Sequence, residues 1–384
     1  MFTVAFISEG KVVNQFSVAD GSKLSEPVLK PREGYIFDGW YKDDRFVNAW
    51  NFATDMVTTN VSLHVKWTYD FWKPKSGDVF IAGYASNTSG TVHTAKIWKN
   101  GVERNLTGTT GKANAYSVFV SGSDVYVAGY EGNNARLWKN GEIQNLTDGV
   151  GAFSVFVSGG DVYVAGIGRN GTTNVAKVWK NGSLLYNLSD GTRNAGARSI
   201  FVSGDDVYVA GYESNGTRNI AKVWKNGIAQ NLTDGTRDAQ ALSIFVSGSD
   251  VYVAGYDRNI NGTGSTAKYW KNGNVQNLTS GTTVLQGVSA NSIFVSGNDV
   301  FVAGANDNLH ATLWKNNTEQ VLINDFRASV ACSVYVSGGD VYMVINHDVT
   351  DNGICAVKLW KNNNIQNITN GTRVEEPFSV FVVE

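Results

Sequence analysis

One aspartate recurs in each of seven copies of a repeated phrase. The regular spacing of these aspartates is the first feature of the chain that could support chemistry. A circle of carboxylates could hold a metal ion. Each Asp, however, opens a strand directly after a Ser-Gly turn, where an Asx side chain commonly caps the hairpin. We therefore expect turn capping at Asp78, Asp124, Asp161, Asp206, Asp250, Asp299 and Asp340.

A tryptophan also recurs once per copy, immediately before a Lys-Asn pair. A circle of exposed indoles could stack sugar rings. Large aromatic side chains at a fixed strand position more often fill the core, so we expect packing between neighbouring units. The residues are Trp98, Trp138, Trp179, Trp224, Trp270, Trp314 and Trp360.

Metal-ligand patterns are weak. The four histidines, His64, His93, His310 and His347, share no ligand spacing, so zinc is unsupported. The segment 257–262 matches the first half of an EF-hand loop, but Lys268 stands where a bidentate Glu is needed. The sequence predicts no metal and no cofactor.

Acid–base and thiol chemistry have little support. His347-Asp348 and Glu375-Glu376 could together serve acid–base catalysis, but no spacing in the sequence brings them together, and we expect ordinary polar surface. Cys332 and Cys355 start strands separated by a third, roughly 9–10 Å apart. That exceeds disulfide reach, so free thiols are expected.

The best candidate ligand-binding residues differ from copy to copy. The residue just ahead of each aromatic strand occupies one structural position in seven different versions, on the side of the variable loops, where repeat proteins bind. Aromatic members could stack on a glycan or grip a protein side chain, and polar members could orient it. They are Tyr116, Phe153, Arg198, Leu242, Asn291, Cys332 and Phe378.

Short strands in a unit of 37 to 49 residues must position these side chains. Each unit reads as an aromatic strand ending in Val-Ser-Gly, then Asp-Val-Tyr-Val-Ala-Gly-Tyr, then a strand ending in Trp-Lys-Asn-Gly, then one ending in Asn-Leu-Thr. The Asn-Gly pair, for example Asn226-Gly227, predicts a type I′ hairpin turn. Four antiparallel strands per repeat are typical of a β-propeller blade.

The two ends of the repeat array are offset. The unit at Asp78 lacks an aromatic first strand, and the chain finishes with an extra one, Ser379-Val-Phe-Val382. If the C-terminal copy completes the first unit, every phrase occurs seven times. The sequence therefore predicts an all-β chain with a seven-bladed propeller at residues 77–384, closed by its C-terminal strand. This part resembles bacterial propellers of no identified activity.

Residues 1–69 carry none of these phrases. They contain Gly34-Tyr-Ile-Phe-Asp-Gly-Trp-Tyr41 and a closing strand that ends in Lys66-Trp67. The segment resembles the internalin-type B-repeat, or Listeria–Bacteroides repeat, whose marks are this aromatic core and a terminal Lys-Trp. The resemblance implies a small β-grasp-like domain of bacterial surface and secreted proteins. Residues 70–76 read as a linker, and we expect core packing of Phe37, Trp40, Phe52 and Trp67.

The composition of the chain argues against some classes of partner. A formal net charge of −2 leaves no basic surplus for nucleic acid. No apolar run approaches the roughly 18 residues that span a bilayer, and the N-terminus has no signal-peptide layout. We expect a monomer that is secreted or held at the bacterial cell surface, with its export signal absent from this sequence.

Three classes of function stay open. The favoured one is non-catalytic recognition or adhesion, with a glycan or protein bound on the variable-loop face. A carbohydrate-active lyase or hydrolase with an axial active site is the alternative, although the seven candidate positions lack the two carboxylates that glycosidases need. The third is a purely structural surface module.

The first prediction concerns the N-terminal region. A fragment of residues 1–70 should fold alone and melt cooperatively, because its aromatic core is local to it. Circular dichroism melting and amide dispersion by NMR measure this. A fragment that stays disordered would show that the region depends on the repeats.

Overall fold

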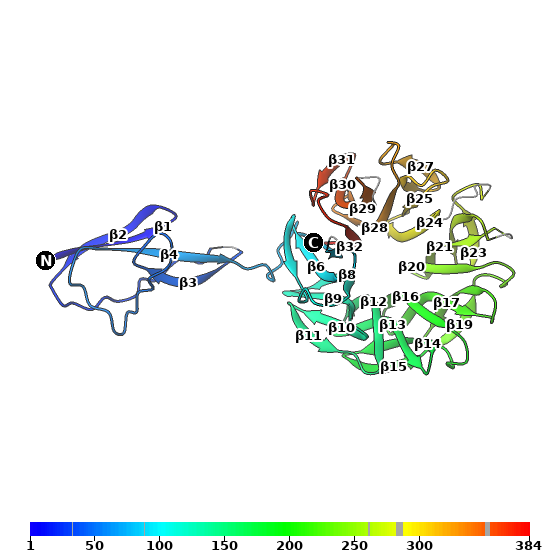
Figure 1. Ribbon diagram of the computed structural model, residues 1–384, viewed down its shortest axis with the longest axis horizontal. Coiled ribbons are helices and arrows are strands. Elements are labelled where there is room, and N and C mark those ends of the chain that lie inside the picture. The colour runs from blue at the N-terminus through cyan, green and yellow to red at the C-terminus, as the bar shows by residue number, and fades with distance from the viewer. Residues whose placement is uncertain (33, 88, 260–261, 282–286, 350–353) are drawn as a thin grey trace. The chain divides into compact units, whose positions relative to one another are not determined.

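The computed structural model describes residues 1–32, 34–87, 89–259, 262–281, 287–349 and 354–384. Within these ranges the chain forms thirty-two strands in eight four-stranded sheets and contains no helix. It divides into two compact units, Met1–Lys73 and Pro74–Glu384 (Figure 1). The prediction of an all-β chain with several four-stranded antiparallel sheets is confirmed.

The first unit holds one sheet with strand order β2-β1-β4-β3. Its central strands β1 and β4 run parallel, and the outer pairs are antiparallel. The bounds are β1 Phe2–Ser8, β2 Lys11–Val18, β3 Tyr35–Tyr41 and β4 Val61–Tyr69.

The aromatic core of this unit agrees with the prediction except at one residue. Trp40 is 1% exposed at its centre, and Phe52 and Trp67 pack against the same cluster. Phe37 is 38% exposed, so its expected place in the core was wrong. It lies on the edge strand β3 just before a bulge, and its ring makes a T-shaped contact with Trp67, with the ring centroids 5.9 Å apart.

The second unit contains seven sheets, numbered here 1 to 7 along the chain. Sheet 1 has the order β32-β5-β6-β7, and each later sheet is four consecutive strands. All neighbouring strands in these sheets are antiparallel.

Sheets 1 to 4 have the following bounds: β32 Glu375–Val382, β5 Val79–Ser86, β6 His93–Lys99, β7 Val102–Asn105; β8 Ala113–Ser121, β9 Asp124–Glu131, β10 Asn134–Lys139, β11 Glu142–Asn145; β12 Gly149–Ser158, β13 Asp161–Asn170, β14 Thr173–Lys180, β15 Ser183–Asn187; β16 Ala195–Ser203, β17 Asp206–Ser214, β18 Asn219–Lys225, β19 Ile228–Asn231.

Sheets 5 to 7 continue the pattern with these bounds: β20 Ala239–Ser247, β21 Asp250–Arg258, β22 Ser265–Lys271, β23 Asn274–Asn277; β24 Ser289–Ser296, β25 Asp299–Ala305, β26 Ala311–Lys315, β27 Thr318–Val321; β28 Ser329–Ser337, β29 Asp340–Asp348, β30 Cys355–Lys361, β31 Asn364–Asn367.

The C-terminal strand completes sheet 1. β32 pairs with β5 from Val382 opposite Val79 to Glu375 opposite Ala85. The first strands then contact one another in a closed cycle, β8, β12, β16, β20, β24, β28 and β32, with β32 back against β8. Figure 1 shows these sheets following one another around a ring.

The repeated tryptophans pack between sheets, as expected. Trp224 of sheet 4 is fully buried among residues of sheet 3, including Ala165 and Val178. Trp98 of sheet 1 packs in the same way on Val344 of sheet 7, so the closing joint has the same apolar contact as the others. Burying an indole contributes strongly to each joint, because an aromatic side chain removes 150–250 Å² from water.

The repeated aspartates make a contact between turns that the sequence did not predict. In sheet 4 the two oxygens of Asp206 accept hydrogen bonds from Lys225 Nζ (2.7 Å) and Asn226 Nδ2 (2.7 Å), both at the other hairpin turn. Asn226 Oδ1 in turn accepts from the backbone N–H of Val207 at 2.8 Å. The hydrogen bond from Lys225 holds the pKa of Asp206 below its usual range. Asp206 therefore ties two turns together. In sheet 1, Asp78 also makes the expected cap, because its Oδ2 accepts from the backbone N–H of Lys75 at 3.0 Å.

This Asp–Lys–Asn contact occurs in all seven sheets, which explains why the two phrases recur together. It also places the Lys ammonium over the ring two residues beyond the Asp, 5.2 Å from Tyr208 in sheet 4. The other ion pairs join Asp78–Lys99, Asp124–Lys139, Asp161–Lys180, Asp250–Lys271, Asp299–Lys315 and Asp340–Lys361.

A closed cycle of serine hydrogen bonds joins the first strands. Each first strand is an edge, so half of its N–H groups lack a partner in its own sheet. In every sheet one of these groups donates to the Ser hydroxyl of the preceding first strand, at 3.1–3.3 Å. The donor–acceptor pairs are Val155–Ser117, Ile200–Ser154, Ile244–Ser199, Ile293–Ser243, Val334–Ser292, Val380–Ser333 and Val118–Ser379.

Two residues beyond each serine, an aromatic ring contacts the equivalent rings of both neighbouring sheets. The centroids are 4.7–5.0 Å apart and the planes are tilted by 44–54°, a favourable arrangement for aromatic pairs. The circle closes through Phe381 of the C-terminal strand. Its members are Phe119, Phe156, Phe201, Phe245, Phe294, Tyr335 and Phe381.

Removing the C-terminal strand should open this ring. Deletion of residues 378–384 takes away the Ser379 acceptor and the Phe381 ring and exposes the edge of β5, so we expect a large loss of stability or aggregation. Ser379→Ala alone should cost about 1–3 kcal/mol, because it leaves the buried Val118 N–H without a partner. Urea denaturation measures both changes.

Ser296→Ala, at the exposed end of β24, is the matched control and should change stability by less than about 0.5 kcal/mol. A truncated chain with the melting temperature of the intact one would contradict the closure.

Candidate functional site

All seven candidate binding residues lie at a β-bulge in a first strand, a feature that the sequence did not reveal. The register of each first strand against its second strand shifts at this residue, which lies between a small buried residue and the serine of the cycle. A bulge inserts one unpaired residue and re-aims its side chain. We call the seven residues the rim: Tyr116, Phe153, Arg198, Leu242, Asn291, Cys332 and Phe378.

Glycine opposite the bulge permits a close backbone approach. A Cβ on Gly129 would lie 2.0 Å from the carbonyl oxygen of Asn114, and the equivalent glycines of five other sheets are as tightly placed. Sheet 7 carries Ile345 at this position and keeps its bulge. Glycine therefore favours the local geometry without being its sole cause.

Four rim residues form a continuous arc. The ring of Tyr116 lies 4.8 Å from Phe378 and 5.2 Å from Phe153, and the Arg198 guanidinium lies over Phe153 at 4.8 Å. All four are partly exposed. We call them the arc; it brings three aromatic rings and one cation from four neighbouring sheets together.

A second group of aromatic residues extends the arc, and sequence reasoning missed it. Tyr84 and Tyr130 stack on Phe378 and Tyr116 at 6.0 and 5.9 Å, and Tyr212 lies 5.4 Å below the Arg198 guanidinium. All three are the last residue of the repeated second-strand phrase. This position also varies among the copies, with Ile167, Tyr256, Ala305 and Asn346 in the other sheets, so the criterion that found the rim could have found it.

The hydroxyl groups here stay protonated. Burial raises the pKa of Tyr116, Tyr130 and Tyr256. Burial also raises the pKa of Tyr84, and the negative charge of Glu376, which hydrogen-bonds to it, adds to the rise. The arc therefore presents neutral hydroxyls that can donate or accept hydrogen bonds.

Leu242 and Asn291 are not members of the arc and line a pocket of 260 Å³ that they share with Tyr256, Arg258 and Ser289. The Asn291 side chain is already engaged. Its Nδ2 donates to the Ala331 carbonyl at 3.2 Å, and its Oδ1 accepts from Ser289 at 2.8 Å. Its expected role in orienting a ligand therefore needs a rearrangement.

Cys332 and Cys355 are both thiols outside any disulfide, as expected. The Cys332 thiol donates to the Val330 carbonyl at 3.5 Å, and the Cys355 thiol donates to Asp348 Oδ1 at 3.1 Å. Burial raises the pKa of each to about 12. Cys332 is therefore a neutral polar residue of the rim at physiological pH and not a nucleophile.

The acid–base residues noted in the sequence are engaged elsewhere. His347 Nε2 contacts Asp325 Oδ2 at 2.9 Å, and Glu375 accepts two hydrogen bonds from Arg373. Asp257 pairs with Lys268 at 2.7 Å, which opposes cation binding there, and residues 260–261 of that segment lie outside the described ones. No cluster of three or more metal-ligating side chains occurs within the described ranges.

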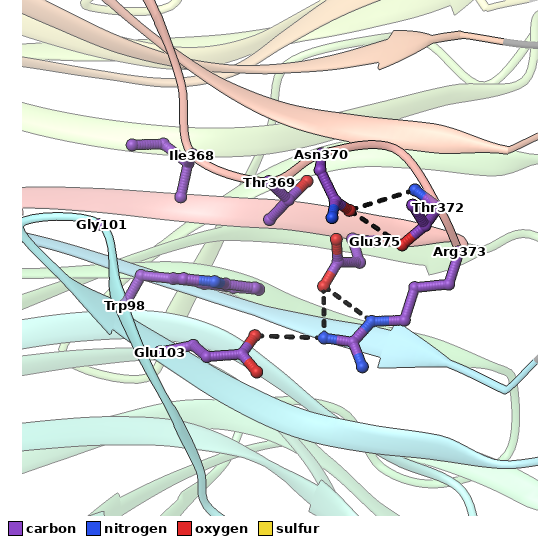
Figure 2. A pocket seen from close by; sticks show the side chains of 9 residues that line it. All are labelled: Trp98, Gly101, Glu103, Ile368, Thr369, Asn370, Thr372, Arg373 and Glu375. Carbon is purple, nitrogen blue, oxygen red and sulfur yellow. Dashed lines mark hydrogen bonds and ion pairs between the residues drawn. The ribbon is translucent and has the colours of Figure 1, made fainter.

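A larger pocket, of 420 Å³, lies where the loop before β32 meets sheet 1 (Figure 2). Figure 2 shows Arg373 between Glu375 and Glu103, at 2.8 and 3.1 Å, with Trp98 beside them. Lys96 also pairs with Glu103 at 3.0 Å. The charged groups are satisfied by one another, so this pocket offers a ligand few open contacts.

Equivalent loops contain a related contact. Arg193 donates to the Asn215 carbonyl at 2.6 Å, and Arg237 lies 3.9 Å from Asp257. Each arginine thus joins the connecting loop to the sheet that follows it. Arg373 makes the equivalent contact where the ring closes, so its cluster is part of the structural joint. The arc therefore remains the better candidate site.

The N-terminal segment matches a known family. Residues 2–66 match the Listeria-Bacteroides repeat domain, which confirms the resemblance in the sequence. The segment is 40% identical over 67 residues to an Evansella cellulosilytica protein named as a candidate Gly-rich membrane protein, and 37% identical over 68 residues to internalin H of Listeria monocytogenes. The match spans 17% of this chain and 8% and 12% of those relatives.

Solved structures similar to the chain include two of Pyrococcus horikoshii acylaminoacyl peptidase, with TM-scores of 0.47 and 0.49 at 10% identity. A prolyl endopeptidase aligns with a TM-score of 0.43 at 11% identity. The alignments cover 77–80% of this chain and about half of each of those chains (50–52%). No activity follows from similarity at this level. Among the described residues, no helix has the length and hydropathy needed to cross a membrane.

The raised thiol pKa values predict slow alkylation. At pH 8, iodoacetamide should modify Cys332 and Cys355 at least ~100-fold more slowly in the native chain than in urea, because little thiolate forms. The rate should rise as the pH approaches 12. Mass spectrometry of timed samples measures it, and native alkylation at the rate of a free thiol would contradict the assignment.

Proposed function

We propose that residues 74–384 form a seven-bladed β-propeller, with each of the seven sheets as one blade, and that the protein is a non-catalytic recognition protein of the bacterial cell surface or exterior. Its ligand, a glycan or a protein, binds at the arc of Phe378, Tyr116, Phe153 and Arg198. The closed cycle of first strands supports the propeller. The Listeria–Bacteroides repeat at residues 2–66 supports the location, because internalin H and a candidate membrane protein contain similar segments.

One observation carries the binding proposal. Four residues of three types, far apart in the sequence, are brought into contact on one rim by bulges in four successive blades. Partly exposed aromatic rings beside a guanidinium are typical of recognition surfaces. The arc itself contains no carboxylate, and the nearby Glu376 is hydrogen-bonded to Tyr84, so a pair of catalytic acids has less support.

The test begins with a glycan-array and protein-array screen of the full chain. For a ligand that binds, Tyr116→Ala and Arg198→Ala should each weaken affinity by about 1–3 kcal/mol, if the arc is the binding hot spot. Asp205→Ala is the matched control, because Asp205 is an exposed turn residue at the opposite end of the hairpin that holds Arg198.

Isothermal titration gives the affinities, and thermal melting checks that each variant folds. Unchanged binding in the Tyr116→Ala, Arg198→Ala double variant, with loss in Asp205→Ala, would move the site to the face of the Ser-Gly turns.

A further inference from the structure

Arg198 differs from several other arginines of the ring, which form ion pairs. Arg136, Arg258 and Arg373 each pair with a carboxylate, of Glu131, Asp238 and Glu375 respectively. Within the described ranges, no carboxylate lies at ion-pair distance from Arg198. Its Nε is buried and has no hydrogen-bond partner there. A buried, charged N–H without an acceptor is costly, so an anionic acceptor beside this guanidinium would be stabilising.

The surroundings hold the guanidinium in place without neutralising it. The ring centroids of Phe153 and Tyr212 lie 4.8 and 5.4 Å from its central carbon. Aromatic rings stabilise a cation through their faces but leave its N–H groups free for in-plane hydrogen bonds. The side chain is thus pre-organised to receive a planar acceptor such as a carboxylate, with little further loss of conformational entropy.

Two hydroxyl groups lie within electrostatic range of the same cation. Burial raises the pKa of Tyr116 and Tyr256, and the positive charge of Arg198 opposes that rise at both. Both tyrosine hydroxyls are therefore protonated. They can donate hydrogen bonds to the oxygens of an anion that the guanidinium binds.

The charge along the arc is asymmetric. Glu376 acts to raise the pKa of Tyr84 and Tyr116, so its negative charge lies at the end away from Arg198. A ligand with one anionic group is therefore favoured with that group at Arg198 and its uncharged part toward Tyr84. A dianion that covers the whole arc is disfavoured by Glu376.

The neighbouring surface favours a ligand with many hydroxyl groups. Tyr256 also lines the 260 Å³ pocket, together with the polar side chains of Arg258, Ser265 and Ser289. On the other side of Arg198, the partly exposed rings of Phe153 and Tyr116 offer apolar surface. A sugar ring has both features, because its C–H face stacks on aromatic rings and its hydroxyls form hydrogen bonds.

We propose that the arc is specific for an acidic glycan, whose sugar carboxylate pairs with Arg198 while its ring stacks on Phe153 and Tyr116. This proposal rests on the proposed recognition function and adds the ligand class. The carboxylate forms a charge-assisted pair with the guanidinium, and the adjacent pocket receives hydroxyls of the next sugar.

The test uses the full chain and three matched probe pairs: trigalacturonic acid and its methyl ester, 3′-sialyllactose and lactose, and a glucuronate-containing tetrasaccharide and its carboxyl-reduced form. We expect at least one acid to bind about tenfold or more tightly than its neutral partner, as a charge-assisted pair implies. Arg198→Gln should remove that preference, and Arg198→Lys should restore it in part, because Lys keeps the charge but not the planar fork. Asp205→Ala should leave it unchanged.

The outcomes separate the two proposals. If the acid and its ester bind equally, and Tyr116→Ala abolishes binding of both, the arc is the recognition site but its ligand is not an acidic glycan. Absence of a preference for the acid in all three pairs also overturns the acidic class. A peptide with a free C-terminal carboxylate that binds through Arg198, when no sugar acid does, overturns the glycan in favour of a protein ligand. Loss of all array binding, with every variant folded, overturns both proposals.

Discussion

The hydrogen bond from a first-strand N–H to the serine of the preceding sheet is the contact on which the rest of the second unit depends. Each first strand is an edge with unpaired donors, and the serine satisfies one of them without extending the sheet. Because the bond is made once at each of the seven joints, it holds all first strands at one level. The same bonds therefore also align the aromatic circle, which lies two residues after each serine, and the rim, which lies one residue before it.

The bulge separates structural residues from recognition residues. On either side of it the chain repeats small buried residues and serine, which the neighbouring sheets require. The bulged residue itself has no partner in the second strand, so tyrosine, arginine, leucine, asparagine and cysteine are all accommodated there. The unit can thus change its surface at seven points while the joints stay constant, and the pairing of Asp with Lys and Asn keeps the opposite turns fixed.

Much of this architecture could be predicted from the sequence, because it depends on repetition. Counting phrases predicted the C-terminal strand in sheet 1, and fixed aromatic positions predicted the tryptophan packing. The bulges were hidden, because Tyr116-Ser117 reads as ordinary strand and only pairing with the second strand reveals the extra residue. The partners of Asp206 were missed because they lie about twenty residues further along the chain, at another turn. The sequence also does not show which rim side chains are available to a ligand. Asn291 and Cys332 belong to the rim, yet both already donate hydrogen bonds to backbone carbonyls nearby.

The pairing of β32 with β5 also determines how the ring responds to mechanical load. The start of β5, Val79, lies opposite the end of β32, Val382, so the two ends of the ring leave the sheet side by side. Tension applied between them separates the strands one hydrogen bond at a time, in the unzipping direction, instead of loading all the bonds together in shear. Tension applied through one end alone puts no load across this seam. A protein attached to a surface by a single end would therefore keep its ring closed under flow, whereas attachment at both ends would make this pair of strands the first to part.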